Sequence, residues 1–220
     1  MDGTVVHRML NLAVCRLFGE AQPDAAWRRV ASPLDVVAVK SNVWRHLPTP
    51  PVLEDAICSE LVGVGVDPGN LAVDDRGARG NPTFRRATVI VNVRPMRTHH
   101  WSGLGTCLKN LIMFVPRPQE YHGDACAPLG AVWRLPELDG KVRLNVLVML
   151  TPQFHSVGAH SFSKEFVWPY GGLLVGTDPV AVDAAGVQLA PLYRRRIKPR
   201  QIKHLKKAAA MGLGSLDPPG

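Results

Sequence analysis

The sequence predicts an α/β fold: one mostly parallel sheet of about five strands, with helices on both faces. Two observations carry this prediction. Short runs of β-branched and apolar residues recur five times along the chain, and each run leads into a polar loop. Segments with apolar residues at helical spacing separate several of these runs, and such crossovers join parallel strands. Because 220 residues suit one compact domain, we expect a single domain over residues 1–220.

The first elements follow from periodicity. Apolar residues from Val5 to Leu17 recur at helical spacing, and Gly19 supplies a stop for this helix. A short helical turn over residues 24–30 leads to a first strand over 35–39. The apolar run in that strand does not alternate with polar residues, which is typical of a strand buried on both faces.

The remaining elements follow from capping residues and further apolar runs. Thr49 and Pro50 predict the cap and the first position of the next helix. Thr177 or Asp178 is expected to cap a last long helix over about 179–192. The other strands are predicted over residues 70–73, 88–93, 144–150 and 172–175.

Composition and charge exclude several classes of protein. Hydrophobic residues make up 46% of the chain and charged residues 20%, which excludes a disordered polyelectrolyte. No apolar run approaches the roughly 18 residues of a membrane-spanning helix, so no membrane span is expected. The sequence shows no leader-type apolar segment, which favours the cytoplasm.

The net charge of +8 comes from one segment. Eight Lys/Arg and no acid lie over residues 194–207, and the rest of the chain holds 18 basic and 18 acidic residues. This segment includes Ile197, Ile202 and Leu205, so we expect a docked surface helix with its cations in water. Nucleic acid is disfavoured as a partner, and any association with a polyanion through this tail would be weak and salt-sensitive.

The polar residues that follow the predicted strands are the candidate site. In open α/β sheets ligands bind beyond the carboxyl ends of the strands, where the loops diverge. Asp183 adds to this set, because it projects from an apolar stripe of the last helix and needs a partner, for which Lys40 or a histidine is suited. The strand-end candidates are Lys40, Asn42, Asp75, Arg76, Thr98, His99, His100 and Asp178.

Residues 97–110 are the densest functional segment, with histidines, glycines, Lys109 and Asn110 close together. The glycines lack the spacing of a dinucleotide fingerprint, and no Walker-type Gly-Lys-Ser/Thr is present. The four cysteines form no C-x-x-C pair, so the chain has no iron–sulfur motif. His99, His122 and Cys126 would supply ligands for a divalent transition metal if their loops converge.

Several of these segments occur in an order that resembles a known family. The segments are residues 39–42, the pair 75–76, 97–99 followed by 108–110, and 176–183. Together they resemble the domain of unknown function 362 family, uncharacterised bacterial and archaeal proteins of which many carry a twin-arginine leader. The resemblance covers nearly the whole chain. It implies export for many relatives and, through the cluster domain of some members, a separate redox partner.

The chain departs from the family pattern in two places. The span from Arg76 to Thr88 is shorter than in many relatives, and residues 148–150 end a strand where many relatives place an aspartate. The first departure implies the loss of a lid or subdomain. The second removes a carboxylate from any mechanism that requires it.

These observations favour an enzyme-like protein that binds a small anionic substrate or a metal in one crevice. Lys40, His99 and Asp183 are the catalytic candidates; His99 would act as general acid/base or ligand, and Asp183 would orient a cationic neighbour. The alternative is a non-catalytic binding or redox-accessory module, which a turnover assay distinguishes. The residues expected to bind the substrate are Asn42, Asp75, Thr98, Lys109, Asn110 and Asp178.

Overall fold

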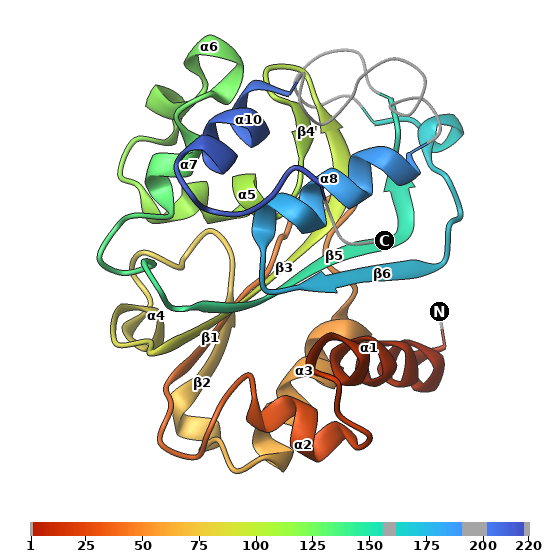
Figure 1. The fold of residues 1–220 in the computed structure, drawn as a ribbon, viewed down its shortest axis with the longest axis vertical. Helices are drawn as coiled ribbons and strands as arrows, with labels where there is room; N and C mark the ends of the chain where they lie inside the picture. The colour runs from red at the N-terminus through yellow and green to blue at the C-terminus, as the bar shows by residue number, and fades with distance from the viewer. Residues whose placement is uncertain (1, 156–161, 191–201, 218–220) are drawn as a thin grey trace.

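Six strands form one sheet in the order β2-β1-β3-β5-β6, with β4 paired to β3 (Figure 1). This computed structural model describes residues 2–155, 162–190 and 202–217. The strands β2, β1, β3 and β5 are mutually parallel, and β6 and β4 run antiparallel to their neighbours. The predicted α/β fold is confirmed, with β4 as an addition. The strands are β1 (Val37–Lys40), β2 (Leu71–Asp74), β3 (Val89–His99), β4 (Gly103–Gly105), β5 (Val142–Gln153) and β6 (Gly172–Gly176).

Helices cover both faces of the sheet, as Figure 1 shows. One face packs against α1 (Gly3–Phe18), α2 (Pro23–Arg28) and α3 (Pro51–Gly63). The other face packs against α4 (Pro82–Arg85), α5 (Cys107–Asn110), α7 (Leu129–Val132), α8 (Pro179–Leu189) and α10 (Lys203–Ala210). The short elements are α6 (Gly123–Cys126) and the 3-10 helices η1 (Pro68–Asn70), η2 (Leu111–Phe114), η3 (Pro118–Tyr121) and η4 (Lys164–Phe166).

The pleat of the strands separates two hydrophobic cores. In β1, Val37 and Val39 belong to the core under α1–α3, whereas Ala38 belongs to the opposite core. In β3, Val89, Val91 and Val93 belong to the α1–α3 core. Alternate residues of a strand point to opposite faces, so Lys40, Asn92 and Arg94 face α5, α7, α8 and α10.

Helix ends agree with the sequence in two places and differ in one. Gly19 ends α1 in a left-handed conformation (φ 69°), as predicted. Asp178 caps α8, because its carboxylate accepts a hydrogen bond from Ala181 N at 2.8 Å. The prediction for Thr49 is wrong: Pro50 is the N-cap of α3, and the Thr49 hydroxyl instead accepts from Asn42 N at 3.1 Å.

The C-terminal helix α10 is docked on the sheet's second face. It packs against α6, α7 and α8, and Leu205 and Ala208 are buried there, as is Ile202 just before it. Residues 194–201 of the predicted basic segment lie outside the described residues. No helix in the described ranges has both the length and the hydropathy needed to cross a bilayer.

Candidate functional site

A row of polar side chains crosses the buried sheet at the carboxyl end of β1. Strand register places Lys40 beside Asp74 on one side and beside Asn92 on the other, and Asn92 beside Asn145. Lys40, Asn92 and Asn145 are fully buried. Because residues in register on neighbouring strands share a face, this row lies on the face that α5 covers.

Lys40 and Asp75 form a buried ion pair in this row. The Lys40 ammonium donates to the Asp75 carboxylate and, at 2.7 Å, to Ser41 O. Burial lowers the pKa of Lys40 to about 8, although Asp75 opposes that shift. Burial alone would raise the pKa of Asp75, but the Lys40 charge and the Val43 N–H outweigh it and hold that pKa below its usual range.

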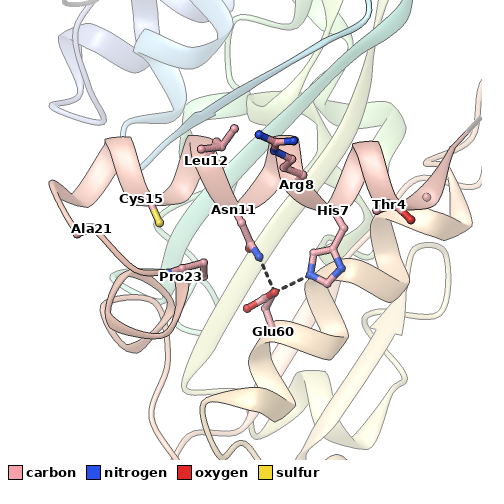
Figure 2. A pocket seen from close by; sticks show the side chains of 10 residues that line it. Thr4, His7, Arg8, Asn11, Leu12, Cys15, Ala21, Pro23 and Glu60 are labelled. Carbon is pink, nitrogen blue, oxygen red and sulfur yellow. Dashed lines mark hydrogen bonds and ion pairs between the residues drawn. The ribbon is translucent and has the colours of Figure 1, made fainter.

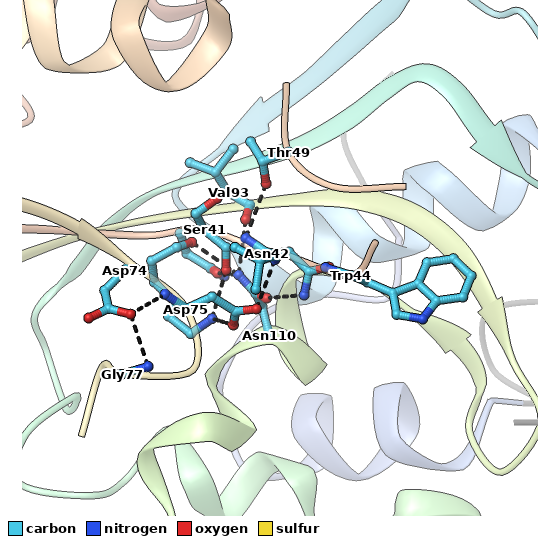
Figure 3. Close-up of polar contacts among 12 residues, drawn as sticks. Ser41, Asn42, Trp44, Thr49, Asp74, Asp75, Gly77, Val93 and Asn110 are labelled. Carbon is cyan, nitrogen blue, oxygen red and sulfur yellow. Dashed lines mark hydrogen bonds and ion pairs between the residues drawn. The ribbon is translucent and has the colours of Figure 1, made fainter. Parts of the chain in front are cut away.

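Four asparagines connect the ion pair to α5. Asn110 Nδ2 donates to Asn92 Oδ1 at 2.9 Å, to Val93 O at 3.0 Å and to Lys40 O at 3.1 Å. Asn42 Nδ2 donates to Asn110 Oδ1 at 3.3 Å, and Figure 3 shows these amides side by side. Asn92 Nδ2 in turn donates to Asn145 Oδ1 at 2.9 Å. The predicted residues Lys40, Asn42, Asp75 and Asn110 therefore lie in one network.

Asp183 binds the start of α5. Its carboxylate accepts from the Thr106 hydroxyl at 2.6 Å, from Cys107 N at 2.9 Å and from Leu108 N at 3.0 Å. The expectation that Lys40 or a histidine partners Asp183 is therefore wrong, because these donors occupy both oxygens. Burial raises the pKa of Asp183 to about 6, despite the three hydrogen bonds.

Two arginines, Arg94 and Arg97, lie on β3 beyond Asn92. Arg94 is 3% exposed, and its Nε has no hydrogen-bond partner; Nε of Arg97 is also buried without one. A Cβ on Gly105 would lie 3.0 Å from Arg94 Nη2 and 3.4 Å from Arg97 Cγ, so this glycine allows the close approach of both side chains. Arg97 also stacks over the Trp44 ring at 4.1 Å.

Both guanidinium groups have lowered pKa values. Burial lowers the pKa of Arg97 to about 8, and the nearby Arg94 charge adds to the shift. Burial likewise lowers the pKa of Arg94, although Asp75 and Asp183 oppose it. The nearby carboxylates, Asp75 for both arginines and Asp183 for Arg94, oppose the effect of burial and do not cancel it.

Lys109 is a further buried cation, contributed by α5. Its ammonium lies 3.6 Å from the Cys126 thiol, and the side chain is almost fully buried. Burial lowers the pKa of Lys109 to about 8; the Arg94 and Arg97 charges lower it further, whereas Cys126 opposes the shift. The position of Cys126 depends on three consecutive residues with positive φ, 47° at Asp124, 54° at Ala125 and 60° at Cys126.

The histidines of the predicted metal site lie beside these cations. The rings of His99 and His122 stack with centroids 5.9 Å apart. Burial lowers the pKa of His99 to about 2 and that of His122 to about 4, and the Lys109 charge lowers both further. Both imidazoles are therefore neutral at pH 7.

The metal hypothesis gains no support from the arrangement of side chains. Among the described residues, no three His, Cys, Asp or Glu form a group that could hold a metal ion. Metal binding by His99, His122 and Cys126 stays a prediction, which a metal analysis of purified protein would test.

Two predicted substrate-binding residues have other surroundings. Asp178 is occupied by Ala181 N and by Ser215 N, the latter at 2.7 Å, and a Cβ on Gly214 would lie 1.7 Å from Asp178 Oδ1. Thus Asp178 joins α8 to the C-terminal loop. Thr98 lies on β3 opposite Leu104 of β4.

The buried cations outnumber the carboxylates near them. We name the side chains of Lys40, Arg94, Arg97 and Lys109 the cation cluster. Two buried carboxylates, Asp75 and Asp183, lie close enough to affect the pKa values of its members. Asp74 is partly exposed on edge strand β2, and its oxygens accept bonds from Asp75 N, Gly77 N and Asn81 Nδ2. The cation cluster and these two carboxylates together therefore carry a surplus of about two positive charges at pH 7, which suits an anionic ligand.

Part of this site has a sequence signal other than its place at the strand ends. Asn92 and Asn145 interrupt otherwise apolar strands, in Val91-Asn92-Val93 and in the matching run 144–146. A buried amide in such a run requires partners on a neighbouring element. Arg94 follows Asn92 by two residues and so shares its face, provided that β3 continues past Pro95.

Two surface cavities lie elsewhere. One has a volume of about 650 Å³ and lies along α1 and α3, where His7 and Asn11 bind the Glu60 carboxylate (Figure 2). The other, of about 340 Å³, lies between Phe84, Phe114 and Glu137, beside Arg79 and Arg85. Neither cavity is lined by the cation cluster.

The fold and the site together define an α/β protein with a buried, cation-rich centre where the parallel strands end. Residues 76–188 match the model of the family described as Domain of unknown function (DUF362), and the chain belongs to this family. No curated protein and no solved structure matches the chain. The matched range includes Arg94, Arg97 and Lys109, but Lys40 and Asp75 precede it.

Proposed function

We propose that this protein binds a small oxyanion-bearing ligand at the cation cluster, in an enzyme-like site. The observation that carries the proposal is the pair of buried guanidinium nitrogens without partners, Nε of Arg94 and Nε of Arg97. A buried donor without an acceptor costs about 1–3 kcal/mol, and more where the group is charged. An oxyanion would accept bonds from both groups.

The electrostatics of the free site support the same ligand class. Lys109 and Arg97 have pKa values lowered to about 8, first by burial and then by neighbouring positive charge. A bound anion offsets the neighbouring positive charge, because each cation then has a negative partner. Binding therefore stabilises the charged forms that the free protein disfavours.

His99 is the residue of the site that is suited to proton transfer. Its imidazole is neutral in the free protein, and Ser102 N lies 3.5 Å from its Nδ1. A neutral imidazole beside a bound anion accepts a proton more readily, because the anion offsets the charges of Lys109 and Arg94. We propose that His99 exchanges a proton with the bound ligand, and that Asp183 positions α5 and hence Lys109.

The experiment is a binding titration with a panel of simple anions: sulfate, phosphate, acetate and succinate. At least one should bind the wild-type protein, and Arg97→Gln should weaken that binding about tenfold or more, the effect of losing one charge-assisted hydrogen bond. Arg134→Gln is the matched control, since Arg134 is exposed and pairs with Asp139.

Binding that is unchanged in Arg97→Gln, or no binding by any member of the panel, would contradict the proposal. A turnover assay with phosphate monoesters and carboxylic acids then distinguishes catalysis from binding alone. Loss of turnover in His99→Gln, with binding retained, would support the enzymatic form of the proposal.

A further inference from the structure

The C-terminal helix α10 carries a histidine whose surroundings are unusual for a core residue. His204 is fully buried, and neither Nδ1 nor Nε2 has a hydrogen-bond partner. A buried imidazole has at least one N–H donor and ordinarily satisfies it. His204 also lies outside residues 76–188, the range that matches the family model.

The packing of α10 places His204 on the face of the sheet that holds the cation cluster. The helix packs on α7 and α8, and both of these pack on α5, which carries Lys109. An ion pair between Lys203 and Asp124 holds the start of α10 against the turn that contains Cys126. Ile202, Leu205 and Ala208, which flank His204, pack in the same core as Leu108 of α5. The Lys109 and Arg94 charges also contribute to lowering the pKa of the His204 ring.

We propose that His204 is a ligand-binding residue of the anion site, and that the ligand is a dianionic tetrahedral oxyanion: a phosphate group, free or as a monoester. This inference rests on the proposed function, and adds a residue and a ligand class to it. The surplus of about two positive charges at the cation cluster matches a dianion. Unpartnered nitrogens on three separate side chains, Arg94, Arg97 and His204, suit a tetrahedral group, whose oxygens point in several directions, better than a carboxylate, whose two oxygens lie in one plane.

Charged and titratable groups lie on α10 itself, on the elements that pack against it, and on α5 and β3, whose cations act on His204. Burial and the cations lower the pKa of His204 to about 3, so the ring is neutral in the free protein at pH 7. A dianion beside it would favour its protonated form, in which both nitrogens donate. The groups are Lys109 of α5, Arg94 of β3, Asp124 and Cys126 of α6, Asp183 of α8, and Lys203, Lys206 and Lys207 of α10 itself, whereas α7 has none.

The test uses sulfate as its first probe, because sulfate is a tetrahedral dianion whose charge does not change near pH 7. Imidazole nitrogen chemical shifts of the full chain are recorded at pH 7 during a sulfate titration. The His204 signals should move toward the values of an imidazolium ring as the site fills. His7, on the opposite face of the sheet, should not respond.

A variant provides the second measurement. His204→Gln keeps a hydrogen-bonding side chain but cannot become charged, so we expect sulfate affinity to fall about tenfold or more. His7→Gln is the matched control and should bind sulfate as the wild type does. If His204→Gln fails to fold, the chemical-shift titration of the wild-type protein still decides. Titrations with inorganic phosphate and with phenyl phosphate then distinguish a free phosphate site from a monoester site.

The outcomes separate the two proposals. Sulfate binding with unmoved His204 signals would overturn the inference about His204 and leave the proposed anion site in place. Binding of acetate or succinate without binding of sulfate or phosphate would overturn the ligand class alone. Failure of every anion to bind would overturn both proposals.

Discussion

The two faces of the sheet are built from alternate residues of the same strands, yet they differ in chemistry. On the α1–α3 face, β1 and β3 contribute five valines, among them Val39 and Val91, which pack in a continuous apolar core. On the opposite face the same strands contribute Lys40, Asn92 and Arg94. The α1–α3 face therefore stabilises the fold by burying apolar surface. On the other face, the desolvation of buried charges offsets part of that stabilisation.

Breaking the ion pair on the polar face should have the largest effect on stability. Lys40→Met leaves the Asp75 carboxylate buried without its cation, and we expect the free energy of unfolding to fall by about 3–5 kcal/mol. The double variant Lys40→Met/Asp75→Leu should recover most of that loss, because neither charge remains. Urea unfolding measures both variants. A double variant no more stable than Lys40→Met would show that the pair is needed for the fold itself.

A cavity on the apolar face should lower stability without affecting the anion site. Ile57 is fully buried in the α1–α3 core, and Ile57→Ala should cost about 2–5 kcal/mol. Sulfate affinity, measured below the unfolding transition, should be unchanged. Weaker binding in this variant would mean that the two faces are coupled.

Much of the polar network follows from sequence reasoning, because the carboxyl ends of parallel strands meet at one edge. That rule brings Lys40, Asn42 and Asp75 together, and the structure agrees. Asn110, predicted from the segment 97–110, joins the same network. It fails for Asp178, because the same position also caps a helix and a capping carboxylate has its oxygens occupied.

The rest of the site depends on tertiary packing that no local pattern encodes. The strand predicted over 88–93 continues to His99, so Arg94 and Arg97 belong to the sheet and not to a loop. His204 lies in a segment whose many cations indicate a solvated face, and only the docking of α10 buries it. Asp183 needs a partner, but the donors come from the start of α5, which periodicity does not reveal.

The pH dependence of stability should show the charge surplus of the polar face. Lys40 and Lys109 have pKa values lowered to about 8, so the unfolded chain binds more protons than the folded protein just above that pH. The free energy of unfolding should therefore rise from pH 7.5 to pH 8.5. Sulfate affinity should fall over the same range, because the cations that bind it lose their protons.

Urea unfolding and sulfate titrations at several pH values measure these two trends. The double variant Lys40→Met/Asp75→Leu should show a smaller rise in stability, since it lacks one of the titrating groups. A fall in wild-type stability over this range would contradict the assignment of buried, disfavoured cations.

The smallest effect on stability is expected at the N-terminus of α8. Asp178→Ala removes the helix cap and the bond to Ser215 N, and should cost about 1 kcal/mol. Thermal unfolding measures this loss, and sulfate affinity should stay at the wild-type value. A large loss of affinity would restore Asp178 to the binding site, as the strand-end reasoning predicts.

The most direct measurement of the central claim is a crystal structure of the protein grown with selenate, a tetrahedral dianion whose selenium can be located by its anomalous scattering. A selenium peak should lie between the Arg94 and Arg97 guanidinium groups, with selenate oxygens at hydrogen-bond distance from their Nε atoms. A fully formed cation cluster with no selenium peak beside it, at selenate concentrations that occupy other sites, would contradict the claim.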